Sequence, residues 1–175
     1  MNNHENHDLE NPALGRLLAM MYYFGYCTFL NEPELRTYLP EAVAITKGYA
    51  ANHKVEFRGQ VGITERGWCH INNGPVAKGL EAHGVVFSHP AENFEVDFPG
   101  FERYFLTVHG NDGKTYDCWT YRLSAPSEHV RPPNFYWQHV PDGLAAWDFP
   151  EEVSRGLLAE YESAKPSADP DQKPA

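Results

Sequence analysis

The sequence predicts an α+β fold, with a mixed, bent sheet or partial β-barrel and a few short helices on one side of it. Two observations favour this class. Many short apolar runs have the composition of strands and are separated by turn residues, whereas helical spacing is confined to two or three short segments. The chain has 175 residues, which is the size of one ordinary domain with a single core.

The first predicted elements are a buried strand and a short helix. The run 19–26 is rich in aromatic and long apolar residues, as expected of a buried strand. Asn31 can cap the helix that follows. We expect Pro33 and Glu34 in its first turn and Leu35 and Leu39 on its inner side. Residues 43–57, despite a Gly-Tyr-Ala break, predict one strand that runs on to Arg58 and Gly59.

The second half of the chain predicts further strands and a closing helix. Residues 68–71 form a short strand that ends at the turn Asn72-Asn73-Gly74-Pro75, and residues 82–87 form a continuous apolar strand. Residues 105–109 and 116–123 flank Gly110-Asn111-Asp112-Gly113, which is typical of a hairpin. A helix begins near Pro150, and its apolar residues at helical spacing are Val153, Leu157, Leu158 and Tyr161.

Composition sets the domain boundaries. Residues 1–15 and 163–175 offer little to bury, so we expect disordered tails around a single domain at 16–162. The formal charge of −10 and the scattered basic residues argue against a nucleic-acid partner. The apolar run 17–30 is too short and too rich in tyrosine to span a membrane, and the start lacks the pattern of a signal peptide. We therefore expect a cytoplasmic protein.

Cysteines and histidines give no sign of a metal or cofactor. Cys27, Cys69 and Cys118 are widely spaced, without a C-x-x-C pair, and we expect buried free thiols. The nine histidines form no recognisable metal-binding motif, so we interpret them as surface or singly hydrogen-bonded residues. The sequence carries no signal of the oligomeric state.

The octapeptide Tyr23-Phe24-Gly25-Tyr26-Cys27-Thr28-Phe29-Leu30 is the most informative stretch. It resembles the YFAYGSNL-type opening of the gamma-glutamylcyclotransferase-like family, with Cys27 at the glycine and Thr28 at the serine. In that family, backbone N–H groups of this turn hold the glutamyl carboxylate of the substrate, as such concave turns do for anions generally. The resemblance implies that Tyr26, Cys27, Thr28 and Phe29 bind the substrate.

Four further stretches match the family pattern in the same order. The family's GVVY strand is similar to Gly84-Val85-Val86-Phe87. Its two later strands resemble Tyr104 and the hairpin that leads to Cys118-Trp119-Thr120-Tyr121. Its Tyr-Glu-Gly motif corresponds in position to Phe98-Pro99-Gly100. Near the C-terminus, Tyr136, Gly143 and Pro150 repeat the family's two seven-residue intervals. The resemblance implies that Tyr136 lines the substrate pocket; a core tyrosine is the structural alternative. Neighbouring Phe135, Trp137 and Trp147 would make such a pocket aromatic.

The expected catalyst is missing from its usual position. Family members release 5-oxoproline by intramolecular attack of the α-amine on the side-chain amide, and the glutamate of Tyr-Glu-Gly transfers the protons. Here Pro99 stands at that glutamate. Three nearby acids are candidates: Glu102, which we prefer because it leads into the strand of Tyr104, Asp97, and Glu95. The alternative interpretation of each acid, which its loop position favours, is a solvated loop residue.

Two functions remain open at this point. The first is a divergent enzyme that acts on a small gamma-glutamyl amide or related anionic compound by carboxylate general acid–base catalysis, without a cofactor. The second is a small-molecule binding or regulatory module that has lost the catalytic acid. A changed reaction with Cys27 as the nucleophile is a variant of the first, because a thiol near convergent N–H groups can have a lowered pKa.

Overall fold

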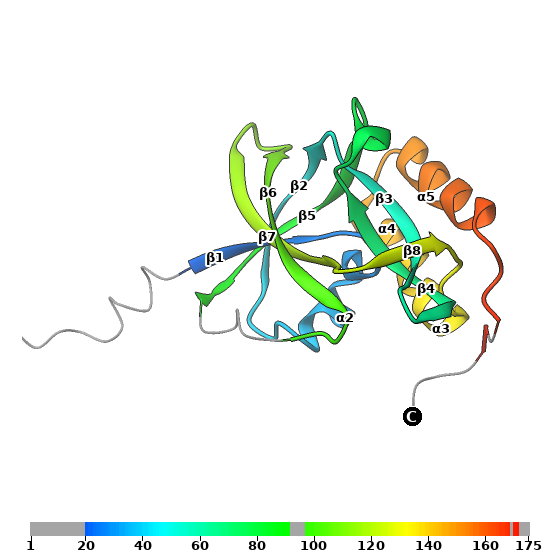
Figure 1. Ribbon diagram of the computed structural model, residues 1–175. Coiled ribbons are helices and arrows are strands. Elements are labelled where there is room, and N and C mark those ends of the chain that lie inside the picture. The colour runs from blue at the N-terminus through cyan, green and yellow to red at the C-terminus, as the bar shows by residue number, and fades with distance from the viewer. Residues whose placement is uncertain (1–19, 92–96, 169, 172–175) are drawn as a thin grey trace, which may run out of the picture.

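Five strands close into a barrel. The computed structural model describes residues 20–91, 97–168 and 170–171. The barrel order is β1 (Met20–Gly25), β5 (Glu81–Pro90), β2 (Val43–Ala51), β6 (Phe101–Gly110) and β7 (Thr115–Leu123), as Figure 1 shows. All neighbours are antiparallel except β1 and β7, which pair in parallel and close the barrel. The predicted α+β class is confirmed, and the partial barrel of the prediction is a closed one.

A second sheet of three strands lies beside the barrel. Its order is β4 (Ile63–Asn72), β3 (Lys54–Gln60) and β8 (Pro126–His129). The prediction of one strand over residues 43–57 is therefore wrong, because the chain leaves the barrel between β2 and β3. The break lies at Asn52 rather than at the Gly-Tyr-Ala sequence. Asn52 adopts a left-handed conformation (φ 57°), which asparagine tolerates better than most residues.

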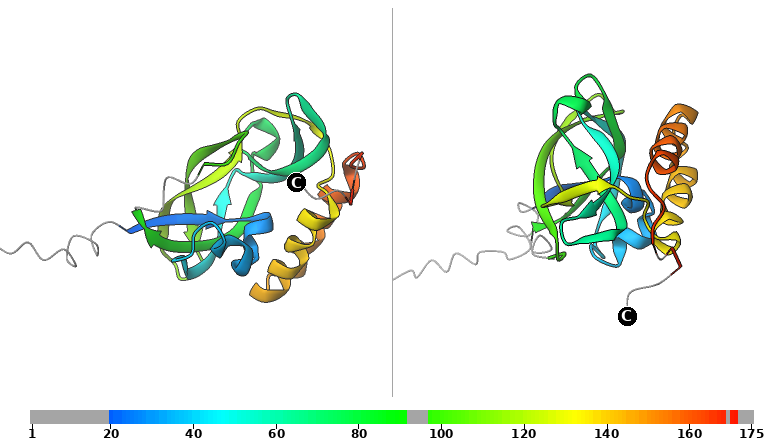
Figure 2. Two further views of the ribbon diagram at one scale, coloured as in Figure 1. Left: turned by 90° about the horizontal axis from the view of Figure 1, so that it is seen from below. Right: turned by 45° about the vertical axis from the view of Figure 1, so that its right-hand side comes forward.

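Short helices cover one side of the molecule. The 3-10 turn η1 (Cys27–Leu30) and α2 (Glu32–Arg36) follow β1, and η2 (Pro75–Ala77) follows β4. Helices α3 (Asn134–Trp137), α4 (His139–Trp147) and α5 (Glu151–Ser163) come after the last strand. Figure 2 shows α4 and α5 on the side of the molecule opposite β6. As predicted, Asn31 caps α2, with its Oδ1 accepting the Glu34 N–H at 3.5 Å.

Buried aromatic side chains lie on both faces of the barrel strands. Phe24 belongs to one core cluster, whereas Tyr23, Phe87 and Trp119 belong to a second, which also includes Leu30 and Leu35. The Trp119 and Tyr23 rings meet edge to face with centroids 4.8 Å apart. The barrel packs against the second sheet through a cluster that includes Phe57 of β3. The two clusters together fix the end of β1, from which the family-like turn projects.

Residues 164–168, which follow α5, lie along the second sheet. Arg131 N–H donates to the Lys165 carbonyl at 2.7 Å, and Ala168 N–H donates to the Glu65 carbonyl at 3.0 Å. Ala164 is buried. The sequence indicated a tail from residue 163 because the segment has few apolar side chains, whereas most of these contacts are made by backbone groups that composition does not report.

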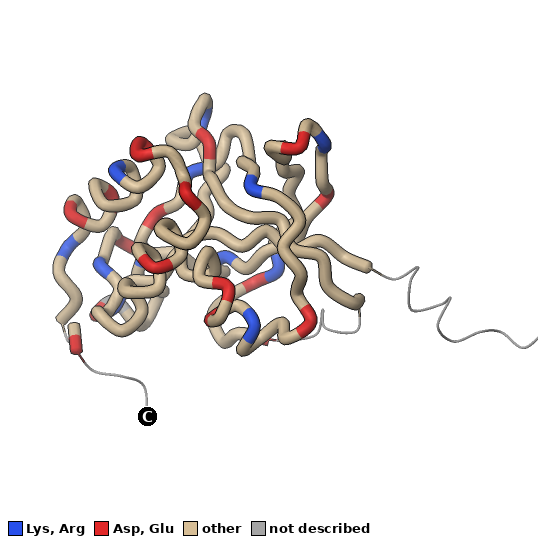
Figure 3. The backbone as a smooth tube through the Cα atoms, turned by 180° about the vertical axis from the view of Figure 1, so that it is seen from behind, with Lys and Arg blue, Asp and Glu red and all other residues tan. Residues whose placement is uncertain are grey.

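Charged residues are spread over the described surface. Figure 3 shows Lys and Arg positions interspersed with the more numerous Asp and Glu positions along the chain. Among the described residues, no helix is both long and apolar enough to cross a membrane.

Candidate functional site

The turn after β1 is the centre of the candidate site. The backbone is extended at Tyr26 (φ −130°, ψ 163°), turns left-handed at Cys27 (φ 55°) and continues as η1. Phe29 N–H donates to the Tyr26 carbonyl at 3.1 Å and closes the turn. Turns of this kind direct successive N–H groups toward a common concave surface, which suits an anion. The turn therefore has a form that fits the role implied by the sequence motif.

Helix α4 packs directly against this turn. A Cβ on Gly143 would lie 2.5 Å from the backbone carbonyl carbon of Leu30, so the two segments can approach this closely only because residue 143 is glycine. Trp147 Nε1–H donates to the Leu30 carbonyl at 2.8 Å. Gly143, the glycine in the C-terminal part of the family-like pattern, thus has a physical role, because it lets α4 pack against the turn.

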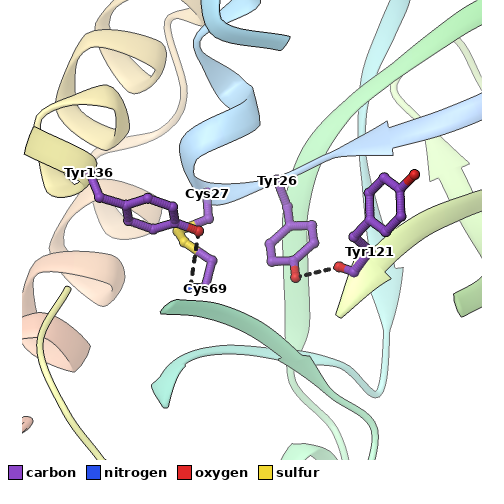
Figure 4. The surroundings of a disulfide bond; sticks show 5 residues. All are labelled: Tyr26, Cys27, Cys69, Tyr121 and Tyr136. Carbon is purple, nitrogen blue, oxygen red and sulfur yellow. Dashed lines mark hydrogen bonds between the residues drawn. A yellow bond between two sulfur atoms is a disulfide. The ribbon is translucent and has the colours of Figure 1, made fainter. Parts of the chain in front are cut away.

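A disulfide joins the turn to the second sheet, which corrects the expectation of free thiols at these positions. Cys27 is bonded to Cys69 of β4, with their Cα atoms 6.4 Å apart (Figure 4). The spacing of 42 residues contains no information on their distance in space. Cys118 is free and buried, as expected, and burial raises the pKa of its thiol to about 12. Because Cys27 has no thiolate in the disulfide form, this form cannot use it as a nucleophile.

A cavity of about 220 Å³ opens beside the turn. Its lining residues are Thr28, Phe29, Glu34, Tyr38, Trp68, Phe98, Phe101, Tyr121, Phe135, Tyr136 and His139. Most of them are aromatic, so the walls suit an apolar or planar group, while polar groups are few and localised. A smaller cavity of about 30 Å³ shares several of these residues and reaches Tyr26 and Cys69.

Thr28, Phe29 and Tyr136, all expected at the substrate, line this cavity together. Tyr136 points from α3 toward the disulfide, and its hydroxyl accepts the Cys69 N–H at 3.2 Å (Figure 4). Burial raises the pKa of Tyr136, and hydrogen bonds with the Thr28 side chain and the Cys69 backbone offset part of the rise. Tyr136 is therefore a neutral hydrogen-bonding group at neutral pH.

Tyr26 has mainly a structural environment. Its hydroxyl donates to the Tyr121 carbonyl at 2.8 Å, and its ring is buried. This bond ties the residue before the turn to β7. Of the two cavities, only the smaller one includes Tyr26 in its lining.

The two acids predicted from the sequence lie away from the cavity lining. Glu102 pairs with Arg122 across β6 and β7 at 2.7 Å, and Asp97 is 88% exposed and lies 3.3 Å from Arg103. Glu95 lies outside the described residues. To reach a ligand in the cavity, the Glu102 carboxylate would have to leave its ion pair. Their catalytic roles therefore stay predictions.

The structure places two other titratable residues in the lining that the sequence interpretation did not select. Glu34 of α2 and His139 of α4 face each other, with 3.8 Å between Glu34 Oε2 and His139 Nε2. Glu34 lies four residues after the octapeptide 23–30, and His139 lies three residues after Tyr136. Residues three or four apart in a helix lie on the same face, and this spacing was the one feature of the sequence that could have indicated them. Nothing in the sequence indicated that the two helices meet.

A second polar cluster lies elsewhere, between β3, β8 and α5. Glu56, His129 and Glu160 have ligand atoms within 4.8 Å of one another. Lys54 Nζ is 2.8 Å from Glu160, and Arg58 Nε is 2.9 Å from Glu56. Burial opposes ionisation of Glu56, but hydrogen bonds from Arg58 and Asn72 outweigh it and hold the pKa of Glu56 below its ordinary value. We interpret this cluster as an ion-pair network that anchors α5.

Solved structures of other proteins have the same fold as this chain. A structure described as a gamma-glutamyl cyclotransferase is similar with a TM-score of 0.72 at 18% identity, over 89% of this chain and 94% of the other. An uncharacterized protein from Homo sapiens matches with a TM-score of 0.70 at 19% identity, over 90% and 93% of the two chains. YkqA from Bacillus subtilis matches with a TM-score of 0.67 at 16% identity, over 90% of this chain and 60% of that one.

Searches with protein-family models and among curated protein sequences found no match. The similarity to solved structures therefore establishes that this chain has the gamma-glutamyl cyclotransferase-like fold, and its chemistry has to be argued from the site.

Proposed function

We propose that this protein is an enzyme that cyclises a small gamma-glutamyl amide, releasing 5-oxoproline and an amine. The observation that carries the proposal is the meeting of Thr28, Phe29 and Tyr136 around one cavity. These residues come from the two ends of the family-like pattern and were selected from the sequence alone. Their meeting beside a concave turn, in a fold shared with a gamma-glutamyl cyclotransferase, supports a site of the same kind.

In this proposal, the turn binds the α-carboxylate of the glutamyl group. The N–H groups of the turn supply partial positive charge without a cationic side chain, which suits one carboxylate. Tyr136 then lies beside the side-chain amide and can hydrogen-bond to it, since burial keeps its hydroxyl protonated. Holding both ends of the glutamyl group brings its amine close to its own amide carbonyl, and such positioning supplies much of the rate acceleration.

The bonds and protons balance without a co-reactant. The α-nitrogen forms a bond to the side-chain carbonyl carbon, and the bond from that carbon to the departing nitrogen breaks. The α-ammonium group loses two protons as it becomes the lactam N–H. The departing nitrogen gains two and leaves as an ammonium ion. A carboxylate that alternately accepts and donates a proton suffices for both transfers.

The cavity indicates which substrates fit. At about 220 Å³ it is smaller than the cavities that bind drug-sized ligands, so the substrate is small. Its aromatic lining favours an apolar or planar amine portion over the charged peptide portion of glutathione.

The test is release of 5-oxoproline from a panel of gamma-glutamyl compounds. We expect turnover of gamma-glutamyl amides of apolar amines, with glutathione turned over more slowly. The corresponding α-glutamyl amides, in which the amine is attached to the other carboxyl group, are matched control substrates and should give no amine release. Absence of 5-oxoproline from every gamma-glutamyl compound would contradict the proposal.

A binding or regulatory module is the second candidate, and a specific observation favours it. Pro99 stands where the family has its acid, and both Glu102 and Asp97 are held in ion pairs outside the cavity lining. Calorimetry with the same panel separates the two candidates. Saturable binding of a gamma-glutamyl compound that remains intact after prolonged incubation supports the module.

A further inference from the structure

We propose that Glu34 is the carboxylate that transfers protons in this cavity, and that His139 and Asn31 position it. The inference rests on the proposed cyclisation. It identifies a carboxylate that can replace the family's glutamate, at whose position this chain has Pro99. Among the described residues that line the cavity, Glu34 is the sole carboxylate. Within the described part of the chain, Glu34 lies opposite an imidazole rather than an arginine or a lysine, with 3.8 Å between Glu34 Oε2 and His139 Nε2.

Asn31 fixes the orientation of this group. As the cap of α2, Asn31 uses its side-chain oxygen to accept the Glu34 N–H at 3.5 Å. Its Nδ2 consequently faces His139 and lies 3.1 Å from Nδ1. An amide nitrogen can only donate, so His139 Nδ1 must be the acceptor in this contact.

This contact determines which tautomer His139 adopts. With Nδ1 accepting, the single proton of the neutral ring lies on Nε2, the atom that faces the Glu34 carboxylate. An imidazolium would place a second N–H against the Asn31 amide and lose that hydrogen bond. Asn31 therefore favours a neutral imidazole that donates toward Glu34, and Glu34 is the member of the pair that exchanges protons.

The surroundings of Glu34 are suited to this task. Tyr38 lines the same wall, and burial together with the nearby Glu34 carboxylate raises its pKa, so its hydroxyl stays protonated. Glu34 and His139 keep 28% and 24% of their side-chain surface exposed, so a proton can exchange with solvent between turnovers. Glu34 accepts a proton from the α-ammonium group, gives it to the departing nitrogen, and ends each transfer as a carboxylate.

The first experiment measures 5-oxoproline release by Glu34→Gln, which keeps the shape of the side chain and removes its proton exchange. Loss of a general acid–base group typically lowers turnover by about 10² to 10⁴-fold. We expect a loss of this size in kcat and a much smaller change in KM. Glu32→Gln is the matched control, because Glu32 lies in the same helix but pairs with Arg36 at the surface. It should retain wild-type turnover.

The outcomes separate the inference from the proposed function. If Glu34→Gln keeps its kcat while Glu102→Gln loses it, the inference is overturned and the proposed function stands with Glu102 as the acid. If the wild-type protein releases no 5-oxoproline from any gamma-glutamyl compound, the proposed function fails and the inference fails with it.

The positioning role of Asn31 has its own readout. Asn31→Asp preserves the helix cap, because aspartate caps as well as asparagine does. It replaces the donating amide with an oxygen that accepts from Nδ1–H, which favours the imidazolium form of His139. We expect an unchanged melting temperature and an acidic limb of the kcat profile that moves to lower pH, because an imidazolium opposite Glu34 favours its carboxylate form. A profile that stays in place would show that Asn31 is only a cap and would overturn its positioning role.

Discussion

The disulfide between Cys27 and Cys69 connects the turn after β1 to strand β4 of the second sheet, and Cys69 also lines the smaller cavity. The N–H of the same Cys69 donates to the Tyr136 hydroxyl at 3.2 Å. Both sulfur-bearing residues are buried, at 0% and 3% exposure, so reagents reach the bond only when the structure opens. The turn, the second sheet and Tyr136 thus depend on one covalent link for their relative positions.

Thiol titration should find one free thiol per chain in denaturant without reductant, and three after reduction. The free thiol belongs to Cys118, and the other two are released from the disulfide. Alkylation at the moment of cell lysis also tests the expected cytoplasmic location, because disulfides are rare in the cytosol. Because all three cysteines are buried, the cells are lysed directly into denaturant with the alkylating reagent; three alkylated thiols would then show that the bond forms only after lysis.

Removal of the disulfide should destabilise the fold. Closing a loop over a separation of 42 residues is worth about 3 to 4 kcal/mol in the chain-entropy model. We expect Cys69→Ser to lower the free energy of unfolding by about this amount, measured by denaturant titration, and to remove the sensitivity of stability to reductant. Cys118→Ser, at a buried free thiol, serves as the control: its stability should still fall when reductant is added.

The backbone at Cys27 gives a third prediction. A non-glycine residue at a left-handed φ of 55° carries a conformational cost of about 1 kcal/mol, and glycine does not. In a Cys69→Ser background, Cys27→Gly should therefore be more stable than Cys27→Ser by up to about 1 kcal/mol. Equal unfolding free energies for the two double variants would mean that the turn relaxes to another conformation once the disulfide is gone.

The order of elements could be predicted from the sequence wherever the signal was local. The hairpin of β6 and β7, the strand β5, the Asn31 cap and the helix after Pro150 all depend on residues within one element or one turn. The division of residues 43–59 between two sheets could not be predicted, because both strands contain β-branched and aromatic residues and the break depends on a left-handed asparagine. Strand β8 has only four residues and a polar sequence, so it had no pattern to detect.

The site was predictable only in part, because the sequence again revealed local motifs but not contacts between distant segments. Thr28, Phe29 and Tyr136 were found because they lie in motifs with fixed spacing. The disulfide and the contact of Glu34 with His139 depend on how α4 and β4 pack around the turn, over separations that no local pattern encodes. The acids nearest Pro99 in sequence were the natural candidates, yet strand alternation directs Glu102 to Arg122 and its neighbour Phe101 to the cavity.

Two glycines in neighbouring helices should respond oppositely to alanine. A Cβ at Gly143 would lie 2.5 Å from Leu30 and 2.6 Å from the Asn31 nitrogen, and these are backbone contacts that cannot rotate away. We expect Gly143→Ala to cost about 1 to 3 kcal/mol of stability and to lower turnover by displacing the turn. Gly156 of α5 has open space where a Cβ would lie, so Gly156→Ala should stabilise the protein by about 0.5 to 1 kcal/mol.

Comparing the two variants separates the general effect of replacing a helical glycine with alanine from the specific effect of the contact between Gly143 and the turn. Melting curves and 5-oxoproline assays of both variants provide the measurement. Gly143→Ala as stable and as active as the wild-type protein would contradict the close packing of α4 on the turn.

Because of two buried histidines, we expect the free energy of unfolding to decrease in mild acid. Burial lowers the pKa of His70 to about 4, and the neighbouring Glu56 carboxylate offsets only part of this effect. His89 also has a pKa lowered by burial, and its Nε2 accepts the Trp119 N–H at 2.8 Å, which requires an unprotonated nitrogen. Both side chains therefore favour the neutral form in the folded state.

The sign and the pH window follow from linkage. An unfolded histidine has a pKa of about 6.5, so below that pH the unfolded chain binds protons that the folded protein does not, and stability falls. For His70 the loss begins near pH 6.5 and levels off near pH 4, and it amounts to about 1.4 kcal/mol between pH 7.5 and 5.5. We expect His70→Gln to reduce the difference in unfolding free energy between these two pH values by that amount. His109→Gln, at an exposed histidine of β6, is the control for loss of an imidazole. An unchanged pH dependence in His70→Gln would show that His70 gains its proton in the folded protein as readily as in the unfolded chain.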